Sequence, residues 1–361
     1  MNRNITSALI STLKNILTNG QTVGSRDQEQ TEVLATLTKI EKPAERFLVV
    51  PGRNNNVFAQ VAETLWVLGG RSDLDFLQNY LPRASDFSDD GETWRAAYGP
   101  RLRKWNGNTD QFEGVIKRLK EDPVTKRAVM NIFDPSSDYR ETKDVPCNNW
   151  LHFIQRNGYL DLNVAVRAND AIWGFSGINF FEWSVLHELV ATTMGWRVGT
   201  LSWFVGTFHI YNRHFNTASK LAHIENPKSM YECGVGHTNI TTTLHDLDSV
   251  LDMVFESEKY SKTGNFNKSL EIEKKINDKF FCNSAKFLKI FNALKLGVDQ
   301  EIIKSFVNEL AGDDFKIAAI EYLSRKWKCT EYLYEIHNIS PEFYYAFKQM
   351  QEQTTEFEMI I

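Results

Sequence analysis

Cys147 lies in the stretch Asp144-Val-Pro-Cys147 and is followed by two groups of residues that could act with it. These groups are Arg167-Ala-Asn-Asp170 and His209-Ile-Tyr211. The thiolate is the nucleophilic form of cysteine, and nearby positive charge favours it by lowering the thiol pKa from about 8.5. We therefore interpret Cys147 as a covalent nucleophile, and the arginine with the Asp, His and Tyr side chains suits chemistry on a phosphorylated ring.

The cysteines of the chain are far apart and show no Cys-x-x-Cys spacing. They are Cys147, Cys233, Cys282 and Cys329. A disulfide framework or a cysteine-based metal site has a closer or paired spacing, so we expect neither disulfides nor a metal. A lone cysteine is most often a small buried hydrophobic residue, and the functional interpretation of Cys147 therefore depends on its neighbours in the sequence.

The composition is that of a globular chain with a large core. Its 361 residues fit one or two domains, and 42% of them are hydrophobic and 12% aromatic. The net charge of −5 argues against a protein whose main task is nucleic-acid binding. No apolar run reaches the ~18 residues that would cross a bilayer, and the polar N-terminus does not resemble a signal peptide. We expect a reduced, cytoplasmic protein without membrane or nucleic-acid partners.

Hydrophobic periodicity predicts helices around a β-sheet. Helical spacing covers residues 1–19, 57–68, 110–121 and 180–194. Strand-like segments cover residues 129–133, 150–155, 159–166 and 203–208. This mixture predicts an α+β fold. Amphipathic helical patterns continue from 243 to 327 and predict an appended, mainly helical C-terminal region.

The chain resembles the thymidylate synthase family from about residue 20 to residue 217, through short motifs in the family's order. They are Phe47-Leu-Val-Val-Pro-Gly-Arg53, Ala62-Glu63-Thr-Leu-Trp66, Tyr98-Gly99, Asp122-Pro-Val-Thr-Lys126-Arg127, Pro146-Cys147, Arg167-x-x-Asp170-x-x-x-Gly174, Gly206 and His209-x-Tyr211-x-x-His214. The resemblance implies a thymidylate synthase-like fold with a β-sheet dimer interface. Residues 1–225 would be the catalytic core, 226–350 a helical extension, and 351–361 a C-terminal tail that closes over the active site.

In that family a cysteine attacks C6 of a pyrimidine nucleotide, and C5 then takes a one-carbon unit from 5,10-methylenetetrahydrofolate. The resemblance makes Cys147 the nucleophile and gives catalytic parts to Glu63, Tyr98 and Asp170. The phosphate candidates are Arg26 and Arg167, with Lys126 and Arg127 donated across a homodimer. The base and sugar candidates are Asn148, Asn179, His209 and Tyr211, and the folate candidates are Arg53, Asp170 and Ile361.

Glu63 also stands out from the residues alone, because it lies among apolar residues of the helix predicted over 57–68. Burying a carboxylate is costly and raises its pKa toward values that suit general acid and base catalysis. We therefore expect Glu63 to move protons at the base and to handle water near C5.

Departures from the synthase pattern concern the base and the fate of the one-carbon unit. The synthase has Pro-Cys-His where this chain has Asn148, and a gapless match places Ile178 at the synthase's base-binding Asn, with Asn179 one residue late. A one-residue bulge after Gly177 would restore Asn179. The synthase's Trp-Asp-x-Trp segment has no tryptophan counterpart before Trp94, which suggests a wetter pocket.

Residues 167–175 and 206–215 are more similar to the phage deoxycytidylate hydroxymethylases, which add water where the synthase adds hydride. We therefore expect C5 hydroxymethylation of a pyrimidine nucleoside 5′-monophosphate in a bacterial cytosol or that of a virus-infected host, with dUMP favoured and dCMP or CMP left open. The first alternative is reductive methylation of dUMP or UMP by a thymidylate synthase. A remote alternative is a non-catalytic family member that binds nucleotide or RNA.

Overall fold

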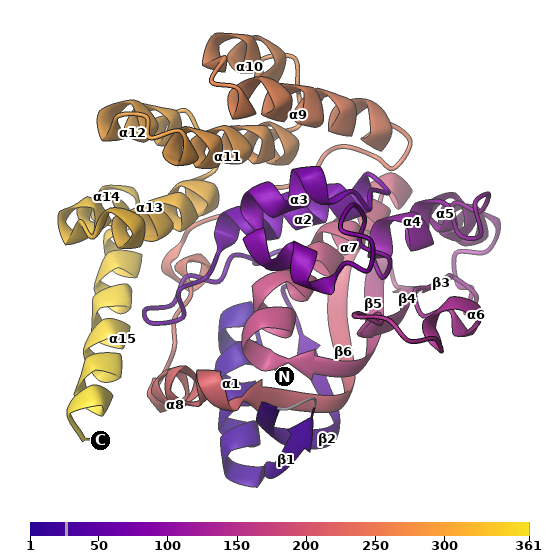
Figure 1. Cartoon of the computed structure of the whole chain (residues 1–361), viewed down its shortest axis with the longest axis horizontal. Helices are drawn as coiled ribbons and strands as arrows, with labels where there is room; N and C mark the ends of the chain where they lie inside the picture. The colour runs from indigo at the N-terminus through magenta and orange to yellow at the C-terminus, as the bar shows by residue number, and fades with distance from the viewer. Residues whose placement is uncertain (26–27, 361) are drawn as a thin grey trace.

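The computed structural model describes residues 1–25 and 28–360. The phosphate candidate Arg26 and the folate candidate Ile361 lie outside these residues. Within the described chain six strands form one sheet in the order β1-β2-β6-β5-β4-β3, surrounded by helices, which confirms the predicted α+β class (Figure 1). The strands are β1 (Gln21–Ser25), β2 (Gln28–Ile40), β3 (Val129–Asn131), β4 (Asn148–Arg156), β5 (Tyr159–Asp170) and β6 (Arg197–Tyr211).

The first part of the described chain has eight α-helices, of which those over residues 5–19, 57–68, 111–121 and 180–194 match the predicted ones and the other four were not predicted. The eight helices are α1 (Ile5–Asn19), α2 (Val57–Leu68), α3 (Leu74–Tyr80), α4 (Tyr98–Arg103), α5 (Gln111–Glu121), α6 (Pro135–Asp138), α7 (Phe180–Met194) and α8 (Phe215–His223). A π-helical turn, Ala171–Asn179, leads directly into α7. The long β1–β2 hairpin has no counterpart among the predicted strands.

The pairing of β5 with β6 is parallel, whereas the other described strand pairs are antiparallel. A parallel pair requires a crossover, and here the π-helical turn and α7 form it. The register places Asp170 opposite His209 at the carboxyl ends of the two strands. β4 runs antiparallel to β5, with Asn148 opposite Val166, so Cys147 lies at the same edge of the sheet.

Helix α2 is buried along its whole length, and α7 is buried over its first three turns. The two helices pack against each other, and α7 packs on β5 and β6. The Asn56 side chain caps the start of α2 by accepting a hydrogen bond from the Ala59 amide at 3.1 Å. Because α2 is enclosed on all sides, the carboxylate of Glu63 is removed from bulk water as the sequence predicted, and the side chain is 9% exposed.

An apolar row crosses four strands of the sheet. Trp150 pairs with Ala165, Ala165 with Phe204, and Phe204 with Leu37, so that paired neighbours share one face. The exposed fractions of Trp150, Phe204 and Leu37 are 37%, 44% and 58%. Large apolar side chains in an exposed row of this kind are typical of a surface that binds another protein. We call these four residues the apolar row.

The C-terminal region is helical, as predicted, and shares its core with the rest of the chain. Its helices are α9 (Leu247–Lys262), α10 (Phe266–Glu273), α11 (Lys279–Lys295), α12 (Gln300–Asn308), α13 (Asp313–Trp327), α14 (Tyr334–Ile339) and α15 (Pro341–Ile360). The Phe58 ring of α2 lies 4.7 Å from Phe287 and 4.9 Å from Tyr322, measured between ring centroids. Figure 1 shows these helices stacked beyond α2 and α3, with α15 running back toward α8.

The C-terminal tail predicted from residue 351 continues α15 up to residue 360. The Phe357 ring lies 5.2 Å from the His223 ring of α8, measured between centroids. Because Ile361 lies outside the described residues, closure of the tail over the active site stays a prediction.

The segment 238–242 joins the two regions, and buried carboxylates hold its backbone. Asp278 accepts hydrogen bonds from the amides of Thr241 and Thr242 at 2.6 and 2.7 Å and also caps α11 through the Phe281 amide at 3.0 Å. Glu188 of α7 accepts from the Ile240 amide at 2.9 Å. The same Glu188 forms an ion pair with buried Arg46. These carboxylates provide hydrogen-bond acceptors for backbone N–H groups that would otherwise have none.

We predict that Asp278→Ala lowers the free energy of unfolding by about 2–4 kcal/mol, because it removes a helix cap and the acceptor of the Thr241 and Thr242 amides, of which the second is buried. Urea unfolding followed by circular dichroism measures the change. The exposed Asp252→Ala on α9 serves as a control for the loss of one carboxylate. Equal stability of the two variants would contradict the role assigned to Asp278.

Candidate active site

Arg167 holds the segment that ends in Cys147. Its Nε donates to the Pro146 carbonyl at 2.9 Å and one Nη donates to the Val145 carbonyl at 2.8 Å. The same Nη lies 3.8 Å from Cys147 Sγ, and the Arg167 amide donates to the Cys147 carbonyl at 2.9 Å. Arg167 therefore fixes this segment through backbone contacts as well as facing the sulfur. A fixed cation beside a thiol favours the thiolate, which supports the nucleophile predicted from the sequence.

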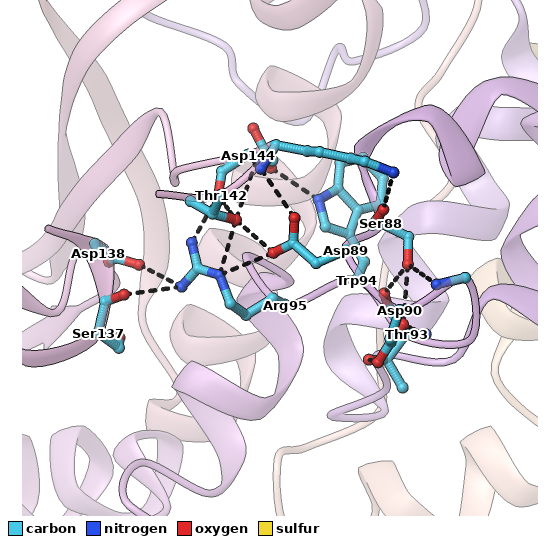
Figure 2. Close-up of polar contacts among 12 residues, drawn as sticks. Ser88, Asp89, Asp90, Thr93, Trp94, Arg95, Ser137, Asp138, Thr142 and Asp144 are labelled. Carbon is cyan, nitrogen blue, oxygen red and sulfur yellow. Dashed lines mark hydrogen bonds and ion pairs between the residues drawn. The ribbon is translucent and has the colours of Figure 1, made fainter. Parts of the chain in front are cut away.

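A second arginine ties the segment before Cys147 to the loop after α3 (Figure 2). Arg95 donates to the Asp144 carbonyl at 2.7 Å, to Thr142 Oγ1 at 3.1 Å and to Asp138 Oδ1 at 3.0 Å. The Trp94 indole donates to the Asp144 carboxylate at 2.8 Å. Trp94 thus holds the segment before Cys147 in place. Its ring also stacks on the ring of Phe87, with 5.5 Å between centroids.

Three acidic groups are linked by their charges to one another or to Cys147, and burial raises the pKa of each. Burial raises the pKa of Glu63 well above its ordinary value, and the charges of Glu182 and Asp144 raise it further. Burial raises the pKa of Glu182 to about 7. Burial also raises the pKa of Tyr98, with further contributions from Cys147 and Glu182. Glu63, Tyr98 and Glu182 therefore form one electrostatically connected group around the cysteine, which we call the acid cluster.

Glu182 was not among the residues predicted from the sequence. It lies in the first turn of α7, is 1% exposed, and follows Asn179 by three residues. The signal that identified Glu63, a carboxylate within an apolar helix, is also present at Glu182 between Phe181 and Trp183.

Asn148 is fully buried, and both ends of its amide are engaged. The Trp183 indole donates to Asn148 Oδ1 at 3.0 Å, and Asn148 Nδ2 donates to Tyr98 Oη at 2.9 Å. This geometry holds Tyr98 in the acid cluster. A direct contact of Asn148 with the base stays a prediction.

Asn179 belongs to a similar chain of hydrogen bonds, which ends at Glu182. The Trp203 indole donates to Asn169 Oδ1 at 3.2 Å, Asn169 Nδ2 donates to Asn179 Oδ1 at 3.4 Å, and Asn179 Nδ2 donates to Glu182 Oε2 at 3.2 Å. The π-helical turn before Asn179 contains one residue more per hydrogen-bonded turn than an α-helix. It is therefore compatible with the one-residue bulge that the sequence required to bring Asn179 into the base-binding position.

Asp170 connects the folate and sugar candidates. Its carboxylate accepts a hydrogen bond from the Ile172 amide at 2.8 Å and so caps the π-helical turn. Arg53 donates to the Ile172 carbonyl and to Ser176 Oγ in the same turn, and burial lowers the pKa of Arg53 to about 10. Arg53 and Asp170 thus both hold the same π-helical turn, and their contact with folate stays a prediction.

His209 lies opposite Asp170 and is 6% exposed. Among the described residues, neither of its ring nitrogens has a hydrogen-bond partner. Burial lowers the pKa of His209, so a neutral imidazole is favoured. Its ring lies 4.9 Å from that of Tyr211, measured between centroids. A buried pair of ring nitrogens suits a polar ligand such as the predicted sugar hydroxyl.

The cross-subunit phosphate candidates lie apart from this group. Lys126 and Arg127 are exposed in the loop between α5 and β3. Their position on the surface suits donation to a neighbouring subunit, which stays a prediction.

The described residues contain no group of three or more His, Cys, Asp or Glu side chains arranged to hold a metal ion. No helix within the same residues is long and apolar enough to cross a membrane.

Comparison with known proteins adds a family and named relatives. A family model described as thymidylate synthase matches residues 8–264. A deoxyuridylate hydroxymethyltransferase of Bacillus phage SP01 is 38% identical over 217 residues, which cover 57% of this chain and 57% of that protein. One from Pseudomonas phage M6 is 39% identical over 183 residues, covering 50% of this chain and 52% of its own length. The matched region thus spans little more than half of these relatives.

A thymidylate synthase of Coxiella burnetii (strain RSA 493 / Nine Mile phase I) is more distant. It is 26% identical over 180 residues, which cover 48% of this chain and 67% of that protein. The relatives therefore include both hydroxymethyltransferases and thymidylate synthases, the two branches of the family that the sequence motifs suggested.

We predict that the ionisation of Glu182 makes stability depend on pH. Its pKa is raised from 4.5 to about 7 on folding, so between these values the folded state holds a proton that the unfolded state has released. Wild-type stability therefore falls as the pH rises through this window. The free energy of unfolding of Glu182→Gln, relative to wild type, should increase by up to about 3 kcal/mol across the window.

Urea unfolding at a series of pH values measures this difference, with the exposed Glu256→Gln on α9 as the matched control. A difference between Glu182→Gln and wild type that does not change with pH would show that Glu182 has an ordinary pKa in the folded protein.

Proposed function

Because this chain belongs to the thymidylate synthase family, we propose that it hydroxymethylates C5 of a pyrimidine nucleoside 5′-monophosphate, with dUMP as the favoured substrate. The observation that carries the proposal is Cys147 held beside the Arg167 guanidinium at one edge of the sheet, together with the acids of the acid cluster, which can donate and accept protons. The hydroxymethyltransferase relatives from phages support the same reaction and the uracil nucleotide.

In the proposed reaction Cys147 attacks C6 of the base, helped by the guanidinium of Arg167 at 3.8 Å from its sulfur. The addition makes C5 nucleophilic. Burial, and then the charge of Glu182, raise the pKa of Glu63 well above its ordinary value, which favours the protonated form that can donate its proton at O4 of the ring. Tyr98 also keeps its proton because burial raises its pKa, while its oxygen accepts the hydrogen bond from Asn148.

Folate binding is part of the proposal, and the residues present suit it. A carboxylate matches the paired N–H donors of a pterin, and Asp170 is held at the end of β5 by the Ile172 amide. Arg53 braces the same turn through the Ile172 carbonyl. When bound, 5,10-methylenetetrahydrofolate would supply the one-carbon unit to C5. Arg53 and Asp170 would orient it.

The nucleotide would be bound by residues of both subunits. Arg167, together with Lys126 and Arg127 of a second copy, would bind the phosphate, and bidentate arginine contacts would make that binding geometrically specific. His209 and Tyr211 would contact the sugar, and Asn179 the base. Reductive methylation of dUMP is the second candidate, since synthases of the same family are also relatives.

We predict that the protein converts dUMP with 5,10-methylenetetrahydrofolate into a product heavier by one CH₂O unit, with release of tetrahydrofolate. Mass spectrometry of reactions with dUMP, dCMP, UMP and CMP identifies both the base and the sugar. Cys147→Ala should lower the rate by more than about a thousandfold. A gain of one CH₂ unit with dihydrofolate would instead identify a methylating synthase, and no turnover with any nucleotide would favour a non-catalytic protein.

We further propose that the apolar row forms a homodimer interface, since paired exposed aromatic and aliphatic side chains cover this face of the sheet. Lys126 and Arg127 would then reach the active site of the other subunit. This arrangement makes the two subunits interdependent.

Subunit complementation tests the arrangement. Cys147→Ala and Arg127→Glu should each be weakly active, whereas refolding an equal mixture should restore about a quarter of wild-type activity, because half of the dimers then contain one complete site. Adding Phe204→Asp to both chains should prevent the recovery by disrupting the interface. A mixture no more active than its components would place Arg127 in its own subunit's site.

A further inference from the structure

Glu182 has a buried oxygen with no hydrogen-bond partner. Its Oε2 accepts from Asn179, but among the described residues Oε1 has no partner, although the side chain is 1% exposed. A buried carboxylate oxygen without a donor is destabilising, so its retention points to a group that binds there during function. A water molecule or a hydroxyl group of a reacting molecule would satisfy it.

The hydrogen-bond chain behind Glu182 fixes the direction of this contact. The Trp203 indole can only donate, so Asn169 must present its oxygen to Trp203 and its amino group to Asn179. Asn179 then presents its own amino group to Glu182. Glu182 is therefore an acceptor on the Asn179 side whatever its protonation state, and Oε1 is the oxygen that remains to accept or hold a proton.

The negative charge of Glu182 makes it harder for Glu63 to lose its proton, and so raises the pKa of Glu63. Glu63 stands on α2, which packs against α7, and the Glu182 charge is the largest contribution to its raised pKa after burial. Two neighbouring buried carboxylates cannot both ionise easily, so such a pair tends to share one proton. Tyr98 and Cys147 belong to the same group through their charges. Glu182, with its unpartnered Oε1, thus belongs to the same electrostatic group as Cys147.

We propose that Glu182 accepts the proton of the water that attacks the one-carbon unit on C5, while Glu63 holds the proton shared by the pair. This inference rests on the proposed hydroxymethylation. Tyr98 is a donor at neutral pH and cannot act as the base.

The addition of water to the methylene group needs no other reactant. After the folate has left, C5 carries an exocyclic methylene group and C6 is bound to Cys147. The water oxygen forms a bond to the methylene carbon, the water proton moves to Glu182, and the electrons of the exocyclic double bond move to O4. When the C4–O4 double bond returns, the C5–C6 double bond forms and the C6–S bond breaks, which releases Cys147 as a thiolate.

Glu182→Gln separates this step from the earlier ones. Release of tritium from C5 of 5-³H-dUMP precedes water addition, so it should stay within about threefold of wild type, whereas hydroxymethyl product should fall by about a hundredfold or more. The methylene intermediate should instead be trapped by added 2-mercaptoethanol as a thioether detected by mass spectrometry. Glu182→Asp, which keeps the charge, should give an intermediate ratio of product to tritium release.

Glu258→Gln is the matched control, because Glu258 is also a buried helix carboxylate but pairs with Tyr80 at 3.0 Å, outside the acid cluster. It should leave the ratio of product to tritium release unchanged. Circular dichroism and dUMP affinity establish that the variants fold and bind. If Glu182→Gln folds poorly, the ratio measured with Glu182→Asp decides.

Equal losses of tritium release and product, or an unchanged ratio in both Glu182 variants, would overturn the role of Glu182. Failure of the proposed function is a separate result, because it is read from the wild-type protein alone. A wild-type product that carries a methyl group, formed with dihydrofolate, would reject hydroxymethylation itself, whatever the variants do.

Discussion

The parallel pairing of β5 with β6 is the constraint on which the candidate site depends. Parallel strands cannot be joined by a hairpin, so the chain crosses over through the π-helical turn and α7. The carboxyl ends of both strands and the beginning of α7 therefore meet at one edge of the sheet. Antiparallel β4 starts at the same edge and places Cys147 there. The pairing of β5 with β6 on one side and β4 on the other thus brings together three residues that are far apart in the sequence, Cys147, Asp170 and His209.

Burial then gives the assembled side chains their chemistry. Since α2 and the start of α7 are enclosed, Glu63 and Glu182 cannot be solvated by bulk water, and their neutral forms are favoured. His209 is kept neutral for the same reason. Arg167 is only half-buried, and its guanidinium lies 3.8 Å from the sulfur. The fold thus combines one cationic contact for the nucleophile with a set of weak acids that can exchange protons near neutral pH.

Much of this could be predicted from the sequence, and the remainder has physical reasons. The boundaries of α2 and α7 follow from strongly apolar periodic segments, and the motifs around Cys147, Arg167 and His209 identified residues that the fold gathers. The β1–β2 hairpin was missed because β2 begins with the polar run Gln28–Glu32, which lacks apolar alternation. Glu182 was missed because no motif covers it, although it lies between apolar residues as Glu63 does, and its effect on Glu63 emerges only when α2 packs against α7.

Two hydrogen-bond chains show why the sequence could not settle the choice of base. An asparagine amide can in principle turn over and complement either uracil or cytosine. In this fold the indole of Trp203 fixes Asn169, which in turn fixes Asn179, just as Trp183 fixes Asn148 toward Tyr98. Each indole is a pure donor, so each chain has one direction. The orientation of the Asn179 amide is therefore set from β6, by a tryptophan remote from it in sequence. If Asn179 binds the base as proposed, an exchange of base specificity requires a change in that buried chain as well as at Asn179 itself.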